Sequence, residues 1–417
     1  LTVAPDLKLI TTRKVALSLQ VANLDMAAVP GTLSPVLAAL LQPMHAMLAA
    51  QQQNVQRLEL GATMTGKDLA LEGYTVAVPG SPLANSLADG VTTALPHEFA
   101  AYLPDSLAYV NASDPMLPGA PGTAQTLLRV SIGILGAFLP EERSEALQQS
   151  LDHLAQQCSQ GRVIAVTAPA GAASTTAPAG AASTTAPQSA TADATLLAVY
   201  RITGAHDARA ALHAFIAELA KSRAEVKEEV WSNTLTFELT PGAEQIGALP
   251  VDLVKLTITP PPLSVRSGAA AAAQPVVIPP FALECRITFL PDKMLVAMGP
   301  RSQAELAALL QRIQAHTPGF TAGARYREIK AAIGPTARRF ESASLLTFCR
   351  VMSGWIPPGK QRDQLGMLLS VFPPQQSAIL ISEEIEPGRL HSVMTIPGEQ
   401  LDFLYSLLKA GQQLGKK

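Results

Sequence analysis

Histidine pairs and adjacent carboxylates are the residues of this chain whose types could support metal or acid–base chemistry. Among its seven histidines, His206 and His213 stand closest together. On a helix they would share a face but lie about 10 Å apart along the axis, whereas the ligands of one ion need i, i+3 or i+4 spacing. Asp207 is better explained as the N-cap of that helix. We therefore expect His206 and His213 to be structural, and we predict no metal site.

Carboxylates are adjacent at Glu141-Glu142, Glu228-Glu229 and Glu383-Glu384. The first pair follows Pro140 at an expected helix start, where negative charge is favourable. The third pair lies in an expected strand, so its two side chains point to opposite faces. We therefore expect solvated surface charges rather than a cooperating acid and base.

Sequence motifs of nucleophilic and nucleotide-dependent catalysis are missing. The chain contains no G-x-S-x-G elbow, no GxxxxGK[ST] loop and no GxGxxG fingerprint, and Ser353-Gly354 lacks the first glycine of the elbow. We predict that the protein is not an enzyme and uses no cofactor. The alternative is a hydrolase whose catalytic groups meet only in three dimensions.

The three cysteines, Cys158, Cys285 and Cys349, are widely separated and form no CxxC pair. This spacing excludes a zinc-ribbon or thioredoxin-type motif. We expect three small, buried, apolar side chains, and a single disulfide stays an open alternative.

Charge is sparse in this chain. Charged residues make up 15% of the sequence and hydrophobic residues 48%, and the formal net charge is −2. A nucleic-acid binder needs several cations on one face, but the densest basic spots are Arg338-Arg339 and Lys416-Lys417. We therefore predict no nucleic-acid partner.

The uncharged stretch from Met26 to Gln56 resembles a membrane segment in composition. A spanning helix needs about 20 mainly apolar residues, whereas several prolines interrupt this stretch. We predict no transmembrane span but a buried or interfacial helix at 33–53, kinked near Pro43, which leaves peripheral membrane contact open. Met44 and Met47 in this helix support a functional alternative, a carrier of lipid or another apolar ligand.

A low-complexity segment from Thr167 to Asp193 contains TAPAGAAST twice in tandem. It cannot bury enough apolar surface to offset its ordering entropy. Its flanks, Arg162–Val166 and Thr195–Tyr200, are typical of strands, so we predict one β-hairpin with an expanded turn. Ser267–Pro275 is expected to be a similar excursion between two later strands.

Strand, hairpin and helix patterns recur along the chain. The clearest match is the breaker that ends two hairpins, Val78-Pro79-Gly80 and Ile396-Pro397-Gly398. Helices are expected after Ser81 as N-cap, after Gly204, after a capping box at Ser302–Glu305, at Arg362–Val371 and after Gly398. The expected strands are Lys14–Val21, Leu58–Met64, Leu69–Val78, Ser106–Asn111, Arg162–Val166, Thr195–Tyr200, Thr234–Leu239, Val251–Thr259, Leu283–Phe289, Met294–Met298, Leu345–Met352, Ala378–Ile385 and Leu390–Ile396.

These patterns predict an α+β protein built from repeated β-α-β-β-α modules, with mainly antiparallel sheets and helices packed on one face. The expected modules are 1–100, then 101–223 with the hairpin insert 167–193, then a strand-rich module at 224–334, and finally 335–417. One continuous sheet would indicate an elongated scaffold, and separate modules would indicate a binder with several sites.

The stretch Leu103-Pro104-Asp105-Ser106-Leu107-Ala108-Tyr109 and the elements after it resemble uncharacterised envelope proteins of GC-rich bacteria, which carry LPxD-type openings to similar modules. The resemblance implies an exported protein in the cell envelope, the periplasm or outside the cell, and no activity; a cytoplasmic protein is the alternative. Leu1 is not an initiator methionine, so we expect a mature or trimmed product.

A non-enzymatic scaffold that binds a protein partner or assembles with itself is the function that these features favour. Trp355, beside Ile356-Pro357-Pro358, is the side chain that we single out as a candidate partner contact. The alternative for Trp355 is a lid over the edge of a core.

Overall fold

The computed structural model describes residues 14–20, 53–88, 100–113, 139–158, 161–167, 194–225, 234–259, 263–265, 274–276, 280–333, 337–353, 360–373, 375 and 377–414. The predicted helix at 33–53 lies almost entirely outside these residues, as do Trp355, the pair Glu228-Glu229 and most of the insert 167–193.

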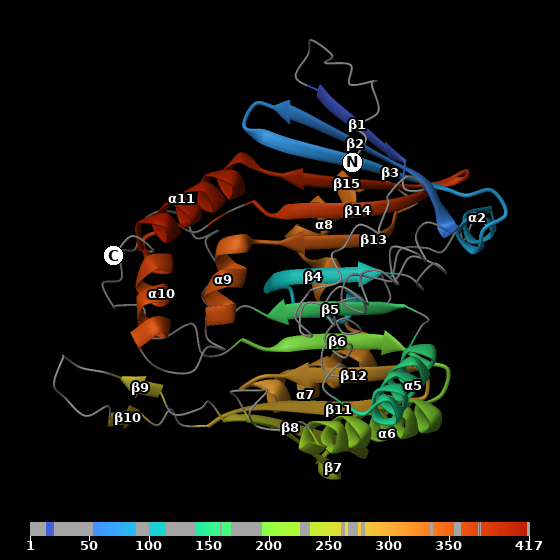
Figure 1. The fold of residues 1–417 in the computed structure, drawn as a ribbon, viewed down its shortest axis with the longest axis vertical. Coiled ribbons are helices and arrows are strands. Elements are labelled where there is room, and N and C mark those ends of the chain that lie inside the picture. The colour runs from blue at the N-terminus through green and yellow to red at the C-terminus, as the bar shows by residue number, and fades with distance from the viewer. Residues whose placement is uncertain are drawn as a thin grey trace.

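Within the described residues, one 13-stranded sheet runs through the molecule in the order β1-β2-β3-β15-β14-β13-β4-β5-β6-β12-β11-β8-β7 (Figure 1). Every neighbouring pair is antiparallel. The strands are β1 (Lys14–Gln20), β2 (Val55–Thr65), β3 (Asp68–Ala77), β4 (Leu107–Ser113), β5 (Arg162–Thr167), β6 (Leu196–Arg201), β7 (Thr234–Ile246), β8 (Leu249–Thr259), β11 (Phe281–Leu290), β12 (Lys293–Met298), β13 (Ala337–Ala343), β14 (Ile379–Glu386) and β15 (Arg389–Ile396). A separate small hairpin pairs β9 (Leu263–Val265) with β10 (Gln274–Val276).

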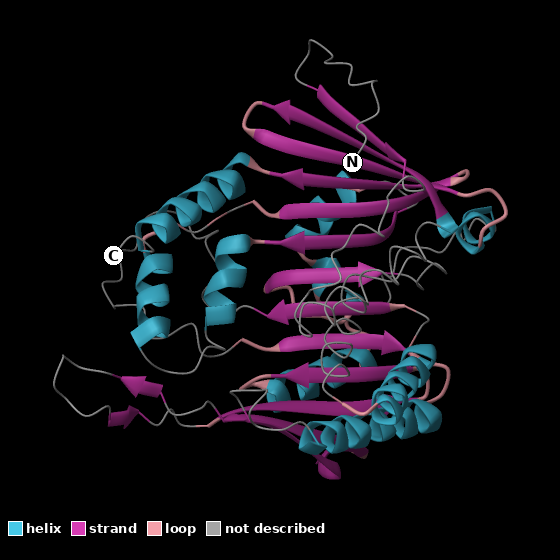
Figure 2. Ribbon diagram, in the orientation of Figure 1, coloured by secondary structure: helices cyan, strands magenta, loops and turns pink. Residues whose placement is uncertain are grey.

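Helices lie on both faces of the sheet (Figure 2). They are α2 (Pro82–Ala88), α5 (Glu141–Gln157), α6 (Ala205–Glu225), α7 (Ser302–Gln314), α8 (Ala324–Ala332), α9 (Leu345–Ser353), α10 (Lys360–Ser370) and α11 (Gly398–Leu414), with a short 3-10 turn η3 at Phe320–Ala322.

Two cores on opposite faces explain this arrangement. Leu295 and Ala297 of β12 pack with α7 and α8 in the largest core. Met294 and Val296 of the same strand pack with α5 and α6 in a second core. Because successive side chains of a strand alternate between faces, a central strand that is apolar on both sides needs cover on both sides. The prediction of helices on one face is therefore wrong, whereas the α+β class and the antiparallel pairing are confirmed.

The hairpin with the expanded turn is confirmed. β5 and β6 pair directly, with Val163 opposite Val199 and Ala165 opposite Leu197. The predicted hairpins β2–β3, β11–β12 and β14–β15 also form. Ser81 caps α2 as expected, since its Oγ accepts a hydrogen bond of 3.1 Å from the backbone N–H of Ala84.

The predicted strand Leu345–Met352 is wrong, because this segment forms helix α9. Leu346 and Val351 are buried in it, and the backbone N–H of Phe348 donates to the Ser344 carbonyl. The strand of this region is β13, which comes just before. The segment that forms β13 contains the charged residues Arg339 and Glu341, which are not typical of a central strand. In the fold these two residues form an ion pair with each other.

The predicted capping box at Ser302 and Glu305 is also wrong. Helix α7 has Arg301 at its N-cap, with no side-chain cap. The Ser302 hydroxyl is fully buried and contacts Arg286 Nη1 at 2.6 Å instead. The Ser302 hydroxyl therefore binds Arg286 of β11 instead of forming the helix cap that the local sequence pattern predicts.

Candidate functional site

The most concentrated polar cluster joins strand β8 to helix α6 and is centred on Asp252. Asp252 is completely buried near the start of β8. It lies opposite Ile287 of β11, so its side chain shares a sheet face with the apolar core beneath α5 and α6. A carboxylate in such a position must be compensated by hydrogen bonds or opposite charge.

A bulge in the neighbouring strand supplies one of these hydrogen bonds. The pairing of β7 with β8 shifts register between Thr240 and Glu244. Gly242 lies in this bulge with φ +60, a conformation that glycine adopts without strain. Its backbone N–H donates to Asp252 Oδ1 at 2.8 Å.

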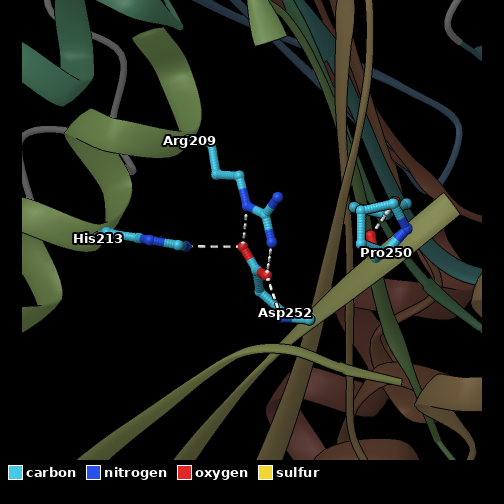
Figure 3. Close-up of polar contacts among 6 residues, drawn as sticks. Arg209, His213, Pro250 and Asp252 are labelled. Atoms are coloured by element: carbon cyan, nitrogen blue, oxygen red, sulfur yellow. Dashed lines mark hydrogen bonds and ion pairs between the residues drawn. The ribbon is translucent and has the colours of Figure 1, made fainter. Parts of the chain in front are cut away.

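Helix α6 supplies the other two partners, as Figure 3 shows. Arg209 and His213 are four residues apart and therefore project from one face of the helix. Arg209 Nε donates to Asp252 Oδ2 at 2.9 Å, and its Nη2 donates to Oδ1. His213 Nε2 lies 2.7 Å from Oδ2. The guanidinium therefore holds the carboxylate through both oxygens, which is the strong and directional form of this ion pair.

The partners of Asp252 also set its protonation. Burial by itself raises the pKa of this carboxyl. The hydrogen bonds from Arg209, His213 and Gly242, together with the charge of Arg209, outweigh burial and hold the pKa below its ordinary value. The carboxylate is therefore ionised at neutral pH, and a negative charge is fixed between the helix and the sheet.

The lowered pKa of Asp252 predicts how stability depends on pH. A carboxyl whose pKa is lower in the folded state stabilises the fold above its unfolded pKa, and this stabilisation is lost as pH falls. We expect the contribution of Asp252 to be complete above about pH 5 and to be lost progressively as the pH falls below about 4, through the lowered pKa of the folded state. Urea unfolding at several pH values, compared between the wild type and Asp252→Asn, measures it. A difference in unfolding free energy that grows as pH falls would contradict the expectation.

This geometry best fits a structural role, in which the cluster attaches helix α6 to the sheet. In a Ser–His–Asp arrangement the carboxylate orients the imidazole, and the far ring nitrogen faces a nucleophile. Here the guanidinium of Arg209 occupies the carboxylate. Among the described residues, His213 forms its polar contact with Asp252 alone. The cluster therefore connects α6, the β7 bulge and β8 at one point.

A second polar cluster lies in the middle of the sheet. Arg339 of β13 contacts Glu341 at 3.0 Å and Glu383 of β14 at 2.7 Å, and Asn111 of β4 donates to Glu341 at 2.8 Å. Burial, followed by the charge of Glu341, raises the pKa of Tyr109 in the same region to about 12. These contacts connect β4, β13 and β14, so this cluster also stabilises the fold.

The structure corrects the expectation of a solvated charge at Glu383. Only 20% of its side chain is exposed, and it is held in the ion pair with Arg339. The prediction that Glu383 and Glu384 point to opposite faces agrees with the register, in which Glu383 lies opposite Ser392 and Glu384 opposite His391. Glu141 and Glu142 are exposed in the first turn of α5, as expected.

Of the residues singled out in the sequence, His213 is the one that lies in the Asp252 cluster. His206 and Asp207 are exposed in the first turn of α6, and Asp207 is inside the helix rather than at the predicted N-cap. Ser353 ends α9, where its hydroxyl donates to the Arg350 carbonyl at 2.7 Å. The prediction of Trp355 as a partner contact concerns a residue outside the described ranges and stays a prediction.

The site formed by Arg209 and Asp252 was not predicted from the sequence, although the sequence around each residue contains a pattern that indicates it. Arg209 stands four residues before His213 on a helical segment, which is the spacing of a shared face. Asp252 is the one charged residue within the otherwise apolar run Leu249–Val254. A single charge in a buried strand indicates a buried partner, but the sequence does not say which residue supplies it.

The three cysteines are free thiols, each partly buried. Burial raises the pKa of Cys158 to about 11 and that of Cys285 to about 12, and both pack against the core beneath α5 and α6. Burial also raises the pKa of Cys349, which packs against α10 and α11. They behave as apolar side chains, and the alternative of a disulfide is not realised.

The fold and this site define an α+β protein organised on one long antiparallel sheet. Comparison of the chain with protein-family models, with curated protein sequences and with solved structures finds no match. Among the described residues, no helix is long and apolar enough to cross a membrane. The same residues contain no group of three or more His, Cys, Asp or Glu side chains placed to hold a metal.

Proposed function

We propose that this chain is a non-enzymatic scaffold of the cell envelope or extracellular space, which binds a protein partner or assembles with itself. The observation that carries the proposal is the single sheet of 13 strands. Its strands come from all four predicted modules, and a continuous sheet favours an elongated scaffold over a set of separate binding modules. The exported location rests on the resemblance of Leu103–Tyr109 and the elements after it to bacterial envelope proteins.

The proposal includes four repeated modules within this sheet. Its support is that the strands of each predicted module are neighbours: β1–β3 of the first, β13–β15 of the last, β4–β6 of the second, and β7, β8, β11 and β12 of the third. The last and second modules meet where β13 pairs with β4, with Glu341 opposite Asn111. Each module would then add its strands to the edge of its neighbour, which is how repeated units extend one sheet.

The polar clusters support a scaffold rather than a catalyst. Arg209 neutralises the buried carboxylate of Asp252 through both of its oxygens. Arg339 bridges two glutamates, with one contact to each. Groups used for acid–base catalysis need a pKa near the working pH and access to a substrate. Asp252 has neither, since it is buried and its pKa is lowered.

Size-exclusion chromatography with light scattering, over a wide range of protein concentrations, tests self-association of the full chain. In parallel, the purified chain captures proteins from an envelope fraction of the source cells. Each captured protein is then purified and titrated against the chain by calorimetry. A concentration-dependent oligomer, or saturable binding of a purified partner, is the expected result.

A strict monomer that binds none of the purified candidates would overturn the scaffold proposal. Turnover of a chromogenic ester or peptide by the wild type, lost on Asp252→Asn while the far-ultraviolet circular dichroism is unchanged, would favour the hydrolase alternative. Fractionation of the source cells tests the location separately, and recovery of the protein in the cytosol would overturn the envelope assignment.

A further inference from the structure

Strand β7 forms one end of the sheet and has a neighbour on one side only among the described residues (Figure 1). Its regular part runs from residue 234 to residue 240, before the bulge that begins after Thr240. An edge strand presents a row of unpaired backbone N–H and C=O groups, which can pair with another strand. Proteins commonly protect such edges with lysine, proline or a bulge. In β7 the proline, Pro241, and the bulge both lie beyond Thr240, so they leave residues 234–240, which contain no lysine and no proline, open to pairing.

The side chains of this edge differ between its two faces. Phe237 and Leu239 are partly buried on the face that carries Leu256 and Val254 of β8. Thr236, Glu238 and Thr240 are exposed and alternate with them. A strand added at this edge must therefore be apolar on one face and polar on the other, if it is to continue both faces of the sheet.

The regular segment of β7 meets this requirement when it pairs with its own copy. In an antiparallel pair centred on Phe237, position 239 faces position 235 of the copy, and both are leucine. Glu238 then faces Thr236 of the copy, so that no like charges are directly opposite. Centring the pair on Glu238 would instead place two glutamates opposite each other, which is unfavourable.

We infer that two copies of this chain pair through β7, antiparallel and centred on Phe237, and so join their sheets into one. This inference rests on the proposed scaffold function and names the partner as a second copy. The contact is isologous, because the same residues lie on both sides of a two-fold axis, and it therefore closes as a dimer. Backbone hydrogen bonds supply much of the attraction, as in other cases of strand addition.

Two substitutions of one exposed residue test the register. Thr236→Glu places a second carboxylate opposite Glu238 of the copy, and it does so twice across the two-fold axis. We expect the dimer dissociation constant to rise by about tenfold. Thr236→Lys places an ammonium opposite the same carboxylate, and we expect dimerisation to tighten by about threefold. Sedimentation velocity of the full chain over a concentration series measures both.

Gln245→Glu and Gln245→Lys are the matched controls, because Gln245 is exposed on the same strand beyond the bulge and outside the proposed register. Both should dimerise like the wild type. Circular dichroism of all four variants checks that the fold is retained.

Four results would overturn the β7 dimer. A dimer that responds equally to the Thr236 and Gln245 variants would show that another surface pairs, and the scaffold function would still stand. Weaker dimerisation of Thr236→Lys would contradict the register. Polymers that lengthen with concentration would indicate head-to-tail pairing of unlike edges. A wild type that stays monomeric at every concentration also ends the inference, and the scaffold function then depends on the partner titrations alone.

Discussion

Replacing Arg209 with methionine is expected to lower the free energy of unfolding by about 3 kcal/mol at neutral pH. The change leaves the buried carboxylate of Asp252 without its cationic partner, and an uncompensated charge away from water is costly. The stem of methionine keeps most of the apolar contact that Arg209 makes. Urea unfolding followed by circular dichroism gives the value.

Removing both charges should be far less harmful than removing one. In Arg209→Met with Asp252→Asn, the amide oxygen can still accept the hydrogen bond from Gly242, so we expect most of the loss to be recovered. Arg143→Met is the control, because Arg143 forms a 3.3 Å ion pair with Glu218 of the same helix α6 nearer the surface. Pairs of that kind contribute about 0–1 kcal/mol. Equal losses for Arg209→Met and Arg143→Met would contradict the special role of the Asp252 cluster.

Replacing Phe340 with alanine is expected to lower the free energy of unfolding by about 4 kcal/mol. Phe340 lies on β13 and is completely buried in the largest core. Its ring contacts Tyr326 of α8 edge-on, with 6.4 Å between ring centroids, and Tyr326 contacts Phe320 in the same way. Alanine would remove the first of these contacts and leave a cavity where helix α8 meets the sheet.

Two comparisons separate this cavity effect from a general loss of apolar surface. Phe340→Leu keeps most of the volume and should cost about 1 kcal/mol. Met367→Ala changes a side chain that is 65% exposed, and should stay within about 0.5 kcal/mol of the wild type. The expectation fails if Phe340→Ala and Met367→Ala shift the denaturant midpoint equally.

The two ends of the sheet, β1 and β7, would have different roles in a dimer that pairs through β7. In the part of the chain that the structure describes, β1 is the other end of the sheet and has β2 as its one neighbouring strand. A closed dimer through β7 would leave both copies of β1 at the outer ends of a joined sheet.

The hairpins were predictable because their signals are local. Turn residues such as Gly66 and Gly388, which adopt φ +63 and φ +74, stand between strands with strong alternation. The expanded hairpin was also visible, since both flanks of the insert keep the pattern of a strand. These features depend on residues close together in the chain, where turn geometry and period already carry the information.

Errors arose where a residue's environment comes from distant parts of the chain. Ser302 has the local pattern of a helix cap, but Arg286 binds its hydroxyl. β13 is not among the strands predicted from the sequence, and its Arg339 is neutralised by Glu383 of the neighbouring strand β14. In both cases the deciding partner stands on another element, so the local pattern pointed to the wrong structure.

The sequence by itself determined the α+β class, the antiparallel hairpins and the missing catalytic motifs, because each follows from composition, period or spacing. Only the tertiary structure decided the order of the strands, the cover on both faces and the meeting of Asp252 with Arg209 and His213. Strand order depends on pairs such as Asn111 with Glu341, which lie far apart in the chain. Such pairs form because of complementary faces and charges in three dimensions, and no local signal in the sequence specifies which strands will meet.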